Sequence, residues 1–190
     1  MSVREIVTVG DPVLRERARE VGDVRAREVQ ALIDDLIDTV RAADGAGLAA
    51  NQIGSLHRVA VVEVRPGHPR YPYKPPVPLT VMVNPVIEPM GEEAAELNEG
   101  CLSVPDLRGT LLRHLAVRVR YLDRDGHPHE EVRRGLTAGT FQHEVDHLDG
   151  VLFLDRVRDP TTLATWEEFD RHHRAGFEAR ARAIVERLGS

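Results

Sequence analysis

Apolar residues near the start of the chain recur at the spacing of one helix face. Steps of three and four residues predict an amphipathic helix over roughly residues 24–43, with a stripe of Val29, Leu32, Ile33, Leu36, Ile37 and Val40. The acidic residues between them fall off this stripe and are expected to face water. Upstream, Asp11-Pro12 pairs a helix cap with a first-turn proline, which predicts a short helix to about Glu20.

The middle of the chain carries the patterns of β-strands. The valine-rich segment 58–64 predicts a buried strand, 79–84 predicts a second, and 115–122 alternates apolar and polar residues. Asp123-Arg124-Asp125-Gly126 has the composition of a hairpin turn, so residues 127–134 are expected to return beside that strand. Helices followed by strands and then helices favour an α+β fold with mainly antiparallel sheets, rather than alternating βαβ units.

Two further segments complete this outline. Six prolines fall within residues 66–78, and proline lacks the N–H that a strand ladder needs, so this segment is predicted to be a loop with His68 exposed. Asp159-Pro160 is expected to start a C-terminal helix over about 161–188. A length of 190 residues suits one domain, and residues 1–190 are therefore predicted to form a single domain.

Charge and composition narrow the classes of function. A net charge of -6 argues against DNA binding through a broad basic face. No apolar run approaches the length that crosses a bilayer, and the first residues lack the pattern of a secretory signal. The single cysteine, Cys101, cannot form an internal disulfide and favours a reducing compartment. These features predict a cytoplasmic protein without a membrane partner.

The strongest chemical signal is the segment Gln142-His143-Glu144-Val145-Asp146-His147. If it is helical, the two histidines lie four residues apart on one face and can bind one metal ion, with Glu144 beside them as a base. Gly150 would end this helix. The same pattern also occurs by chance on solvated helices, and a catalytic metal needs a third protein ligand.

Cys101 is the candidate for that third ligand. A lone cysteine is ordinarily a small buried hydrophobe. Here it follows Gly100 in a Pro-bounded loop about forty residues before the His-Glu segment, and a thiolate binds Zn²⁺ or Fe²⁺ well. Together with His143 and His147 it would make a three-ligand site with one open position for water.

A glycine-rich segment, Asp44 to Gly54, follows the first long helix. It lacks the Gly-Lys-Ser/Thr ending of a phosphate loop, so a nucleotide site is weakly supported. One interpretation is a narrow backbone wall beside a substrate, with Gln52 offering an amide donor. The alternative is a tight turn that leads into the next strand.

Taken together, three motifs resemble those of the peptide deformylase family in order and spacing over about residues 3–156: Gly45-Ala46-Gly47-Leu48-Ala49-Ala50-Asn51-Gln52, Glu99-Gly100-Cys101-Leu102-Ser103 and Gln142-His143-Glu144-Val145-Asp146-His147-Leu148. The resemblance implies a metal-dependent hydrolase that removes the N-formyl group from the initiator methionine of nascent polypeptides and releases formate. It also implies antiparallel sheets packed around a central metal-binding helix, with N-terminal helices and a C-terminal helix.

The resemblance further assigns roles to single residues. It implies Cys101, His143 and His147 as metal ligands, Glu144 as catalytic acid and base, and the Gln52 side chain with the Leu102 backbone N–H as donors to the developing oxyanion. The backbone at Ala46, Gly47 and Gly100 is expected to pair with an extended peptide. The family's typical metal is Fe²⁺, with Zn²⁺, Ni²⁺ or Co²⁺ also accommodated.

Two departures from the family pattern concern the substrate pocket. Gly139 stands where a larger side chain is usual, near the expected methionine pocket, and the proline-rich loop 67–78 resembles an insertion that changes access. Three alternatives stay open: a His-Glu-x-x-His zinc peptidase, a structural metal site, and a divergent deformylase paralogue with another substrate. For the peptidase, Asp149 and Asp155 are the only nearby candidates for a third ligand, and neither has the usual spacing. Docking on the ribosome through the C-terminal helix is a further hypothesis. The alternative is that this helix only packs against the rest of the protein.

Overall fold

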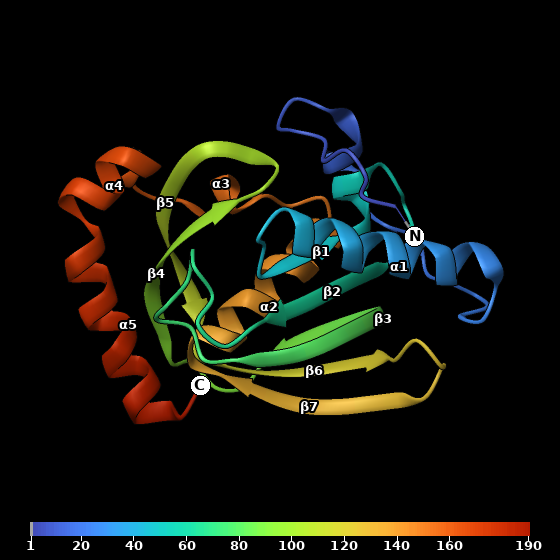
Figure 1. The fold of residues 1–190 in the computed structure, drawn as a ribbon. Coiled ribbons are helices and arrows are strands. Elements are labelled where there is room, and N and C mark those ends of the chain that lie inside the picture. Colours follow the sequence, from blue (N-terminus) through green and yellow to red (C-terminus); the bar gives the residue numbers. More distant parts are fainter. Residues whose placement is uncertain (1) are drawn as a thin grey trace.

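A computed structural model describes residues 2–190 and shows two antiparallel sheets on either side of one helix (Figure 1). The five-stranded sheet has the order β1 (Gly47–Ala49), β2 (Val59–Val64), β3 (Val77–Pro89), β6 (Ala116–Leu122) and β7 (Pro128–Arg134). The three-stranded sheet has the order β4 (Ala94–Cys101), β5 (Val104–His114) and β8 (Ala164–Thr165). The predicted α+β fold with antiparallel sheets is confirmed, including the β6–β7 hairpin.

Helix α2 (Gly135–Leu148) occupies the centre of the molecule (Figure 1). Every one of its residues except His143 is buried. A helix buried on all sides needs no amphipathic stripe, which explains why its sequence shows only a weak helical periodicity. It ends where the sequence predicted, because Gly150 adopts a positive φ of 75° just beyond it. The metal motif therefore lies on a rigid, enclosed element.

Helix α1 (Arg27–Ala42) lies where the apolar stripe predicted it and packs its buried face on β2. The shorter N-terminal helix is smaller than expected. Asp11 caps it as predicted, by accepting a hydrogen bond from the Val13 N–H, but it is a 3-10 turn, η1 (Pro12–Arg15), and ends before Glu20. One capped turn fixes the chain direction without adding a further helix.

The C-terminal segment is broken where the sequence predicted one continuous helix. After the 3-10 turn η3 (Pro160–Thr162) and the short strand β8, helix α4 (Trp166–His172) and helix α5 (Arg174–Leu188) meet at His173. The bend brings the rings of Phe169 and Phe177 to 6.0 Å from each other, and both side chains are buried. Helix α5 then runs beside β4 and α2 (Figure 1).

The proline-rich loop between β2 and β3 folds onto the body of the protein. The prediction that His68 is exposed was wrong, since only 3% of its surface is accessible and its ring lies 5.1 Å from that of Tyr71. Tyr73 is also buried and meets Phe177 of α5 edge to face at 5.1 Å. The aromatic residues between the prolines thus anchor this loop.

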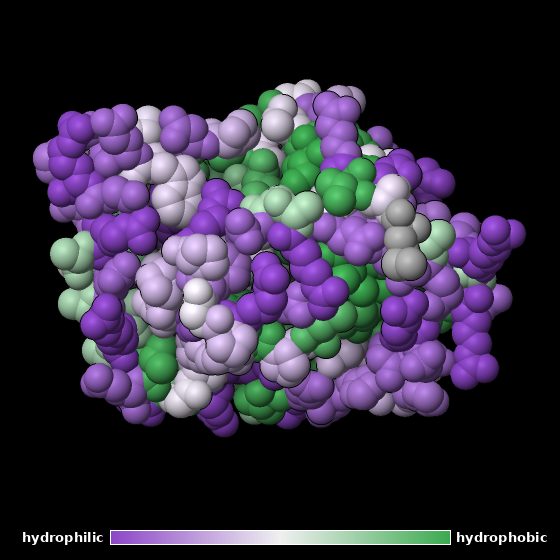
Figure 2. All heavy atoms as spheres, in the orientation of Figure 1, coloured by the Kyte–Doolittle hydropathy of each residue, from purple (hydrophilic) through white to green (hydrophobic). Residues whose placement is uncertain are grey.

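On the face seen in Figure 2, hydrophilic residues dominate the rim and hydrophobic residues gather toward the middle.

Candidate active site

Helix α2 presents its two motif histidines one turn apart, and the end of β4 brings Cys101 to them. The rings of His143 and His147 are 5.0 Å apart. The Cys101 Sγ atom lies 3.1 Å from Nε2 of His147. One donor atom from each of these three residues lies within 4.8 Å of the other two. The structure therefore brings together the three residues that the sequence singled out as metal ligands.

The donor set fits a divalent transition metal. A thiolate and two imidazoles suit Zn²⁺ and Fe²⁺, whereas Mg²⁺ and Ca²⁺ prefer oxygen ligands. Burial lowers the pKa of His147 well below its ordinary value, so its imidazole is neutral and keeps a lone pair for a metal. Within residues 2–190, no fourth His, Cys, Asp or Glu joins this group. Three protein donors would leave a position on a bound metal open for chemistry, unlike the four of a closed structural site.

The alternative third ligands of a zinc peptidase are engaged elsewhere. Asp149 accepts a hydrogen bond of 2.8 Å from Nη1 of Arg58. Asp155 forms an ion pair with Arg15 and accepts a hydrogen bond from the Leu152 N–H. Neither carboxylate belongs to the group of donor atoms around His143. The geometry therefore gives no support to a peptidase ligand set.

Glu99 holds the His143 ring and is a site residue that the sequence reasoning did not single out. Its Oε2 lies 2.9 Å from Nδ1 of His143, which leaves the other ring nitrogen for a metal. Two 2.8 Å hydrogen bonds from Arg113 fix the same carboxylate, and Arg113 also pairs with Asp146. Burial acts to raise the pKa of Glu99, but Arg113 and His143 outweigh it and hold the pKa well below its usual value.

Glu144 lies inside the site with one oxygen free. Its Oε2 is buried and has no hydrogen-bond partner among the described residues. Burial raises the pKa of this carboxyl to about 7. Gly47 faces the same carboxylate so closely that a Cβ at this position would overlap it. The glycine in the first motif is therefore required by close packing rather than by its backbone angles.

Gln52 and Leu102 approach the cysteine from different elements. Gln52 lies in the 3-10 turn η2 (Ala50–Ile53), where its Oε1 accepts from the Ala49 N–H. Its Nε2 is therefore directed at the site, 3.5 Å from the Cys101 Sγ and 3.1 Å from the Ser103 Oγ. Leu102 follows Cys101 and lines the same cavity. Both predicted oxyanion donors thus border the space beside the thiol.

Two edge strands flank this space. Strand β1, which starts at Gly47, is the outermost strand of one sheet, and β4, which ends at Cys101, is the outermost strand of the other. Ala46, Gly47 and Gly100 all line the cavity between them. An edge strand keeps backbone donors and acceptors for another chain. The predicted peptide-pairing residues therefore lie where an extended peptide can add to a sheet.

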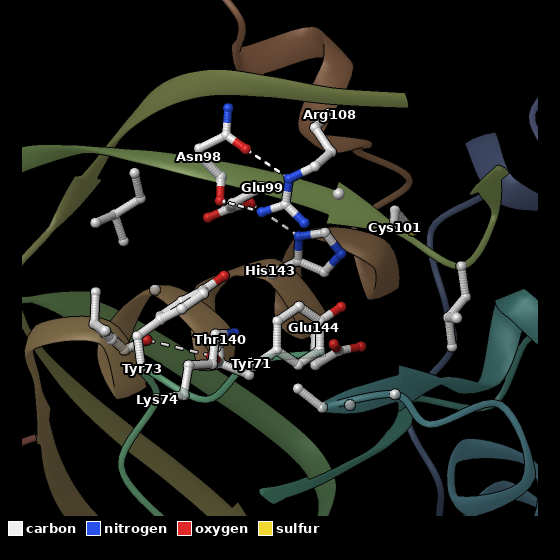
Figure 3. A pocket seen from close by; sticks show the side chains of 18 of the residues that line it. Tyr71, Tyr73, Lys74, Asn98, Glu99, Cys101, Arg108, Thr140, His143 and Glu144 are labelled. Atoms are coloured by element: carbon white, nitrogen blue, oxygen red, sulfur yellow. Dashed lines mark hydrogen bonds and ion pairs between the residues drawn. The ribbon is translucent and has the colours of Figure 1, made fainter. Parts of the chain in front are cut away.

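The cavity encloses about 670 Å³, including its open mouth, and extends from the metal ligands past α2 (Figure 3). Residues that the family motifs do not contain also line it: Tyr71 beside Glu144, and Tyr73, Lys74 and Phe177 at the end away from Cys101 (Figure 3). Arg108 also borders it; the guanidinium carbon lies 4.0 Å from the centre of the Trp166 ring and 4.5 Å from that of Phe169. The Nη1 group of Arg108 is buried without a partner among the described residues. In the sequence, the proline-rich loop and Gly139 pointed to this part of the site, whereas Arg108 and Phe177 were not singled out for it.

Gly139 borders the same end of the cavity. A Cβ at Gly139 would lie 2.6 Å from Cδ1 of Leu97, so the leucine side chain fills the space that a larger residue would take. The predicted departure from the family pattern is thus compensated from β4.

A Cys-His-His donor set at the wall of a cavity, with a carboxylate beside it, defines the class of metal-dependent hydrolases. Residues 3–162 match the polypeptide deformylase family. Peptide deformylase 2 of Nostoc sp. is 44% identical over 164 residues, which cover 86% of this chain and 91% of the relative. Peptide deformylase 1 of Prochlorococcus marinus is 44% identical over 170 residues, 90% of this chain and 88% of the relative.

Solved structures agree with the sequence relatives. A class I type b peptide deformylase from Acinetobacter baumannii, determined with Met-Ala-Ser bound, has a TM-score of 0.78 and 39% identity, covering 82% of this chain and 99% of that one. Peptide deformylase from Thermotoga maritima has a TM-score of 0.74 and 34% identity, covering 84% and 100%. The chain belongs to the polypeptide deformylase family. It is a hydrolase that removes the N-formyl group from nascent polypeptides, and the peptidase alternative is not favoured.

Proposed function

We propose that Cys101, His143 and His147 hold one catalytic metal ion and that Glu144 is the acid and base of the deformylation reaction. The family implies a catalytic metal, and the observation that carries this assignment is the convergence of the three donor atoms within 4.8 Å. We propose Fe²⁺ as the native metal, since a thiolate with two imidazoles suits it; Zn²⁺, Ni²⁺ and Co²⁺ suit the same donors. When bound, the metal supplies Lewis-acid activation of water and of the formyl carbonyl.

The remaining chemistry is assigned to residues of the chain. Glu144 takes a proton from the attacking water at its unpartnered Oε2 and later delivers it to the nitrogen of the leaving amine. Gln52 Nε2 and the Leu102 backbone N–H donate to the formyl oxygen as negative charge builds there. One such donor is typically worth ~3 kcal/mol of transition-state stabilisation. The products are formate and a free amino terminus.

The substrate is positioned by its backbone. An extended formyl-methionyl peptide adds between β1 and β4 and pairs with the backbone at Ala46, Gly47 and Gly100. Both strands are sheet edges, which supports this placement. The relative from Acinetobacter baumannii was determined with a peptide that begins with methionine, which supports the same class of ligand.

The assignment is tested by metal content and turnover measured together under anaerobic conditions. Glu144→Gln is expected to keep the metal and lose turnover of a formyl-Met dipeptide, because the carboxylate relays protons and does not bind the metal. Cys101→Ala is expected to lose the metal itself. Glu96→Gln, an exposed position on the same strand as Cys101, is the matched control. Full turnover by Glu144→Gln would contradict the proposed role.

We also propose that the protein acts in the cytoplasm and meets nascent chains at the ribosome. Among residues 2–190, no helix is both long and apolar enough to cross a membrane. Arg180 and Arg182 are exposed on α5, where an RNA surface would contact them. Because Phe177 of the same helix lines the cavity, deleting the helix would disturb the site as well. Replacing both arginines by glutamate is the cleaner test, and unchanged co-sedimentation with ribosomes would contradict docking.

A further inference from the structure

The far end of the cavity contains the only lysine of the chain. Of the 25 Lys and Arg residues, Lys74 is the one lysine, and every other is arginine. Lysine differs from arginine in carrying a compact ammonium with three N–H donors on a flexible stem. Lys74 comes from the proline-rich loop, outside the three family motifs, and its side chain lines the cavity.

The contacts of Lys74 leave hydrogen-bonding capacity unused. Its Nζ lies 2.9 Å from Oγ1 of Thr140 and 4.8 Å from the centre of the Tyr71 ring (Figure 3). The Thr140 hydroxyl donates its own proton to the Leu136 carbonyl, so it accepts from Lys74. Within residues 2–190, Thr140 is the single acceptor in hydrogen-bonding range of this ammonium. Two N–H donors therefore remain for water or for a ligand in the cavity.

The position of Lys74 matches the end of a methionine-sized side chain. Thr140 precedes His143 by three residues on α2, which places it roughly 4.5 Å along the helix axis from the metal ligand. Leu97, Leu136 and Phe177 line the same cavity, and on the proposed function the first side chain of a peptide with its formyl group at the metal site enters there. The Thr140–Lys74 pair places hydrogen-bond donors beside these apolar side chains, in a cavity that Glu99 and Arg108 also line.

We propose that Lys74 enables the protein to deformylate peptides whose first residue is methionine sulfoxide, in addition to methionine. The inference rests on the proposed function and deepens it by naming a second class of substrate. Oxidation gives the methionine side chain a strong acceptor oxygen at almost unchanged length. In an apolar pocket that oxygen would lose its hydrogen bonds to water, whereas the free N–H groups of Lys74 replace them.

The reaction at the formyl group is the same for both substrates. Water adds to the formyl carbon, the C–N bond breaks, the amine takes a proton and formate leaves. The sulfoxide is neither reduced nor oxidised, and no further reactant is required. Discrimination therefore arises only from the fit of the first side chain.

The test compares formyl-Met-Ala-Ser with formyl-methionine sulfoxide-Ala-Ser on the metal-loaded wild type and on Lys74→Met. The wild type is expected to hydrolyse the sulfoxide peptide with a kcat/KM within about tenfold of that for methionine, while Lys74→Met lowers the sulfoxide-to-methionine ratio by about tenfold or more. Arg70→Met is the matched control, since Arg70 lies in the same loop but donates to the Ala43 carbonyl. It is expected to leave the ratio unchanged.

A second measurement reports on Lys74 directly. Because Lys74 is the single lysine, zinc-loaded protein made with ¹³C-labelled lysine gives one Cε signal. This signal is expected to shift on adding methionine sulfoxide-Ala-Ser but not on adding norleucine-Ala-Ser. A wild type that cleaves formyl-methionine peptides and rejects the sulfoxide overturns this inference alone. An equal loss on both substrates in Lys74→Met also overturns it. Failure of the wild type on both peptides overturns the proposed function as well.

Discussion

The carboxylate of Glu99 is expected to decide how tightly the metal is held, although it is not itself a ligand. Glu99→Gln keeps the shape but removes the charge that accepts from His143 Nδ1 at 2.9 Å and twice from Arg113 at 2.8 Å. The glutamine side chain has one acceptor oxygen for these three donors, so its NH₂ group would lie against at least one of them. Loss of one charge-assisted hydrogen bond costs roughly 1.5–3 kcal/mol. The expected weakening of metal binding is about 10- to 100-fold.

The assay is competition for Zn²⁺ with a chromophoric chelator, combined with urea unfolding of the metal-free protein. Arg113 keeps Asp146 as a partner, so the free energy of unfolding of the metal-free variant is expected to fall by about 3 kcal/mol, the lower end of the range for broken buried pairs. Glu96→Gln, exposed on the same strand, is expected to change it by less than about 0.5 kcal/mol and to leave the zinc affinity unchanged.

Two outcomes would refute parts of this reasoning. An unchanged zinc dissociation constant in Glu99→Gln would show that Glu99 does not orient the His143 ring. A weaker zinc affinity with no change in the stability of the metal-free protein would show that Arg113 does not depend on Glu99 for its stabilisation.

Three further outcomes are expected. Gly47→Ala should lower kcat/KM by more than about tenfold in a formyl-Met assay, since its methyl group would displace Glu144, whereas Gly22→Ala, in open space, should change nothing. Burial lowers the pKa of Lys74 from 10.5 to about 8, so the folded protein loses this proton before the unfolded chain does. The free energy of unfolding, measured by urea titration, should therefore rise between pH 8 and 10.5 by more in the wild type than in Lys74→Met. Phe177→Ala should lower the free energy of unfolding by about 3–5 kcal/mol in urea unfolding and raise KM, because Phe177 lines the cavity. An unchanged KM would show that Phe177 does not contact the substrate.

Local patterns predicted the parts of the fold that local physics controls. The apolar stripe of α1, the valines of β2 and the turn chemistry before β7 each depend on residues close in sequence. Strand β5 was not predicted, because its pattern is interrupted by polar residues such as Arg108 and Arg113, whose partners lie on other elements. The break at His173 likewise follows from the packing of Phe169 and Phe177, which no local signal records.

The site shows the same division. Residue chemistry and spacing selected Cys101, His143 and His147, and the structure brings their donor atoms together. Glu99, the partner of His143, was missed even though it belongs to a recognised motif. Its position two residues before Cys101 does not show toward which residue its side chain points. Lys74 was missed because only the folding of the loop, anchored by Tyr73 on Phe177, places it in the cavity.

The two sheets end in facing edge strands, β1 and β4, with the cavity between them. In the proposed placement, a peptide between them would add a strand and join the two separate hydrogen-bonded sheets. Binding should therefore stiffen the protein far beyond the point of chemistry. Slower deuterium uptake along both strands in the presence of a product peptide would show this stiffening.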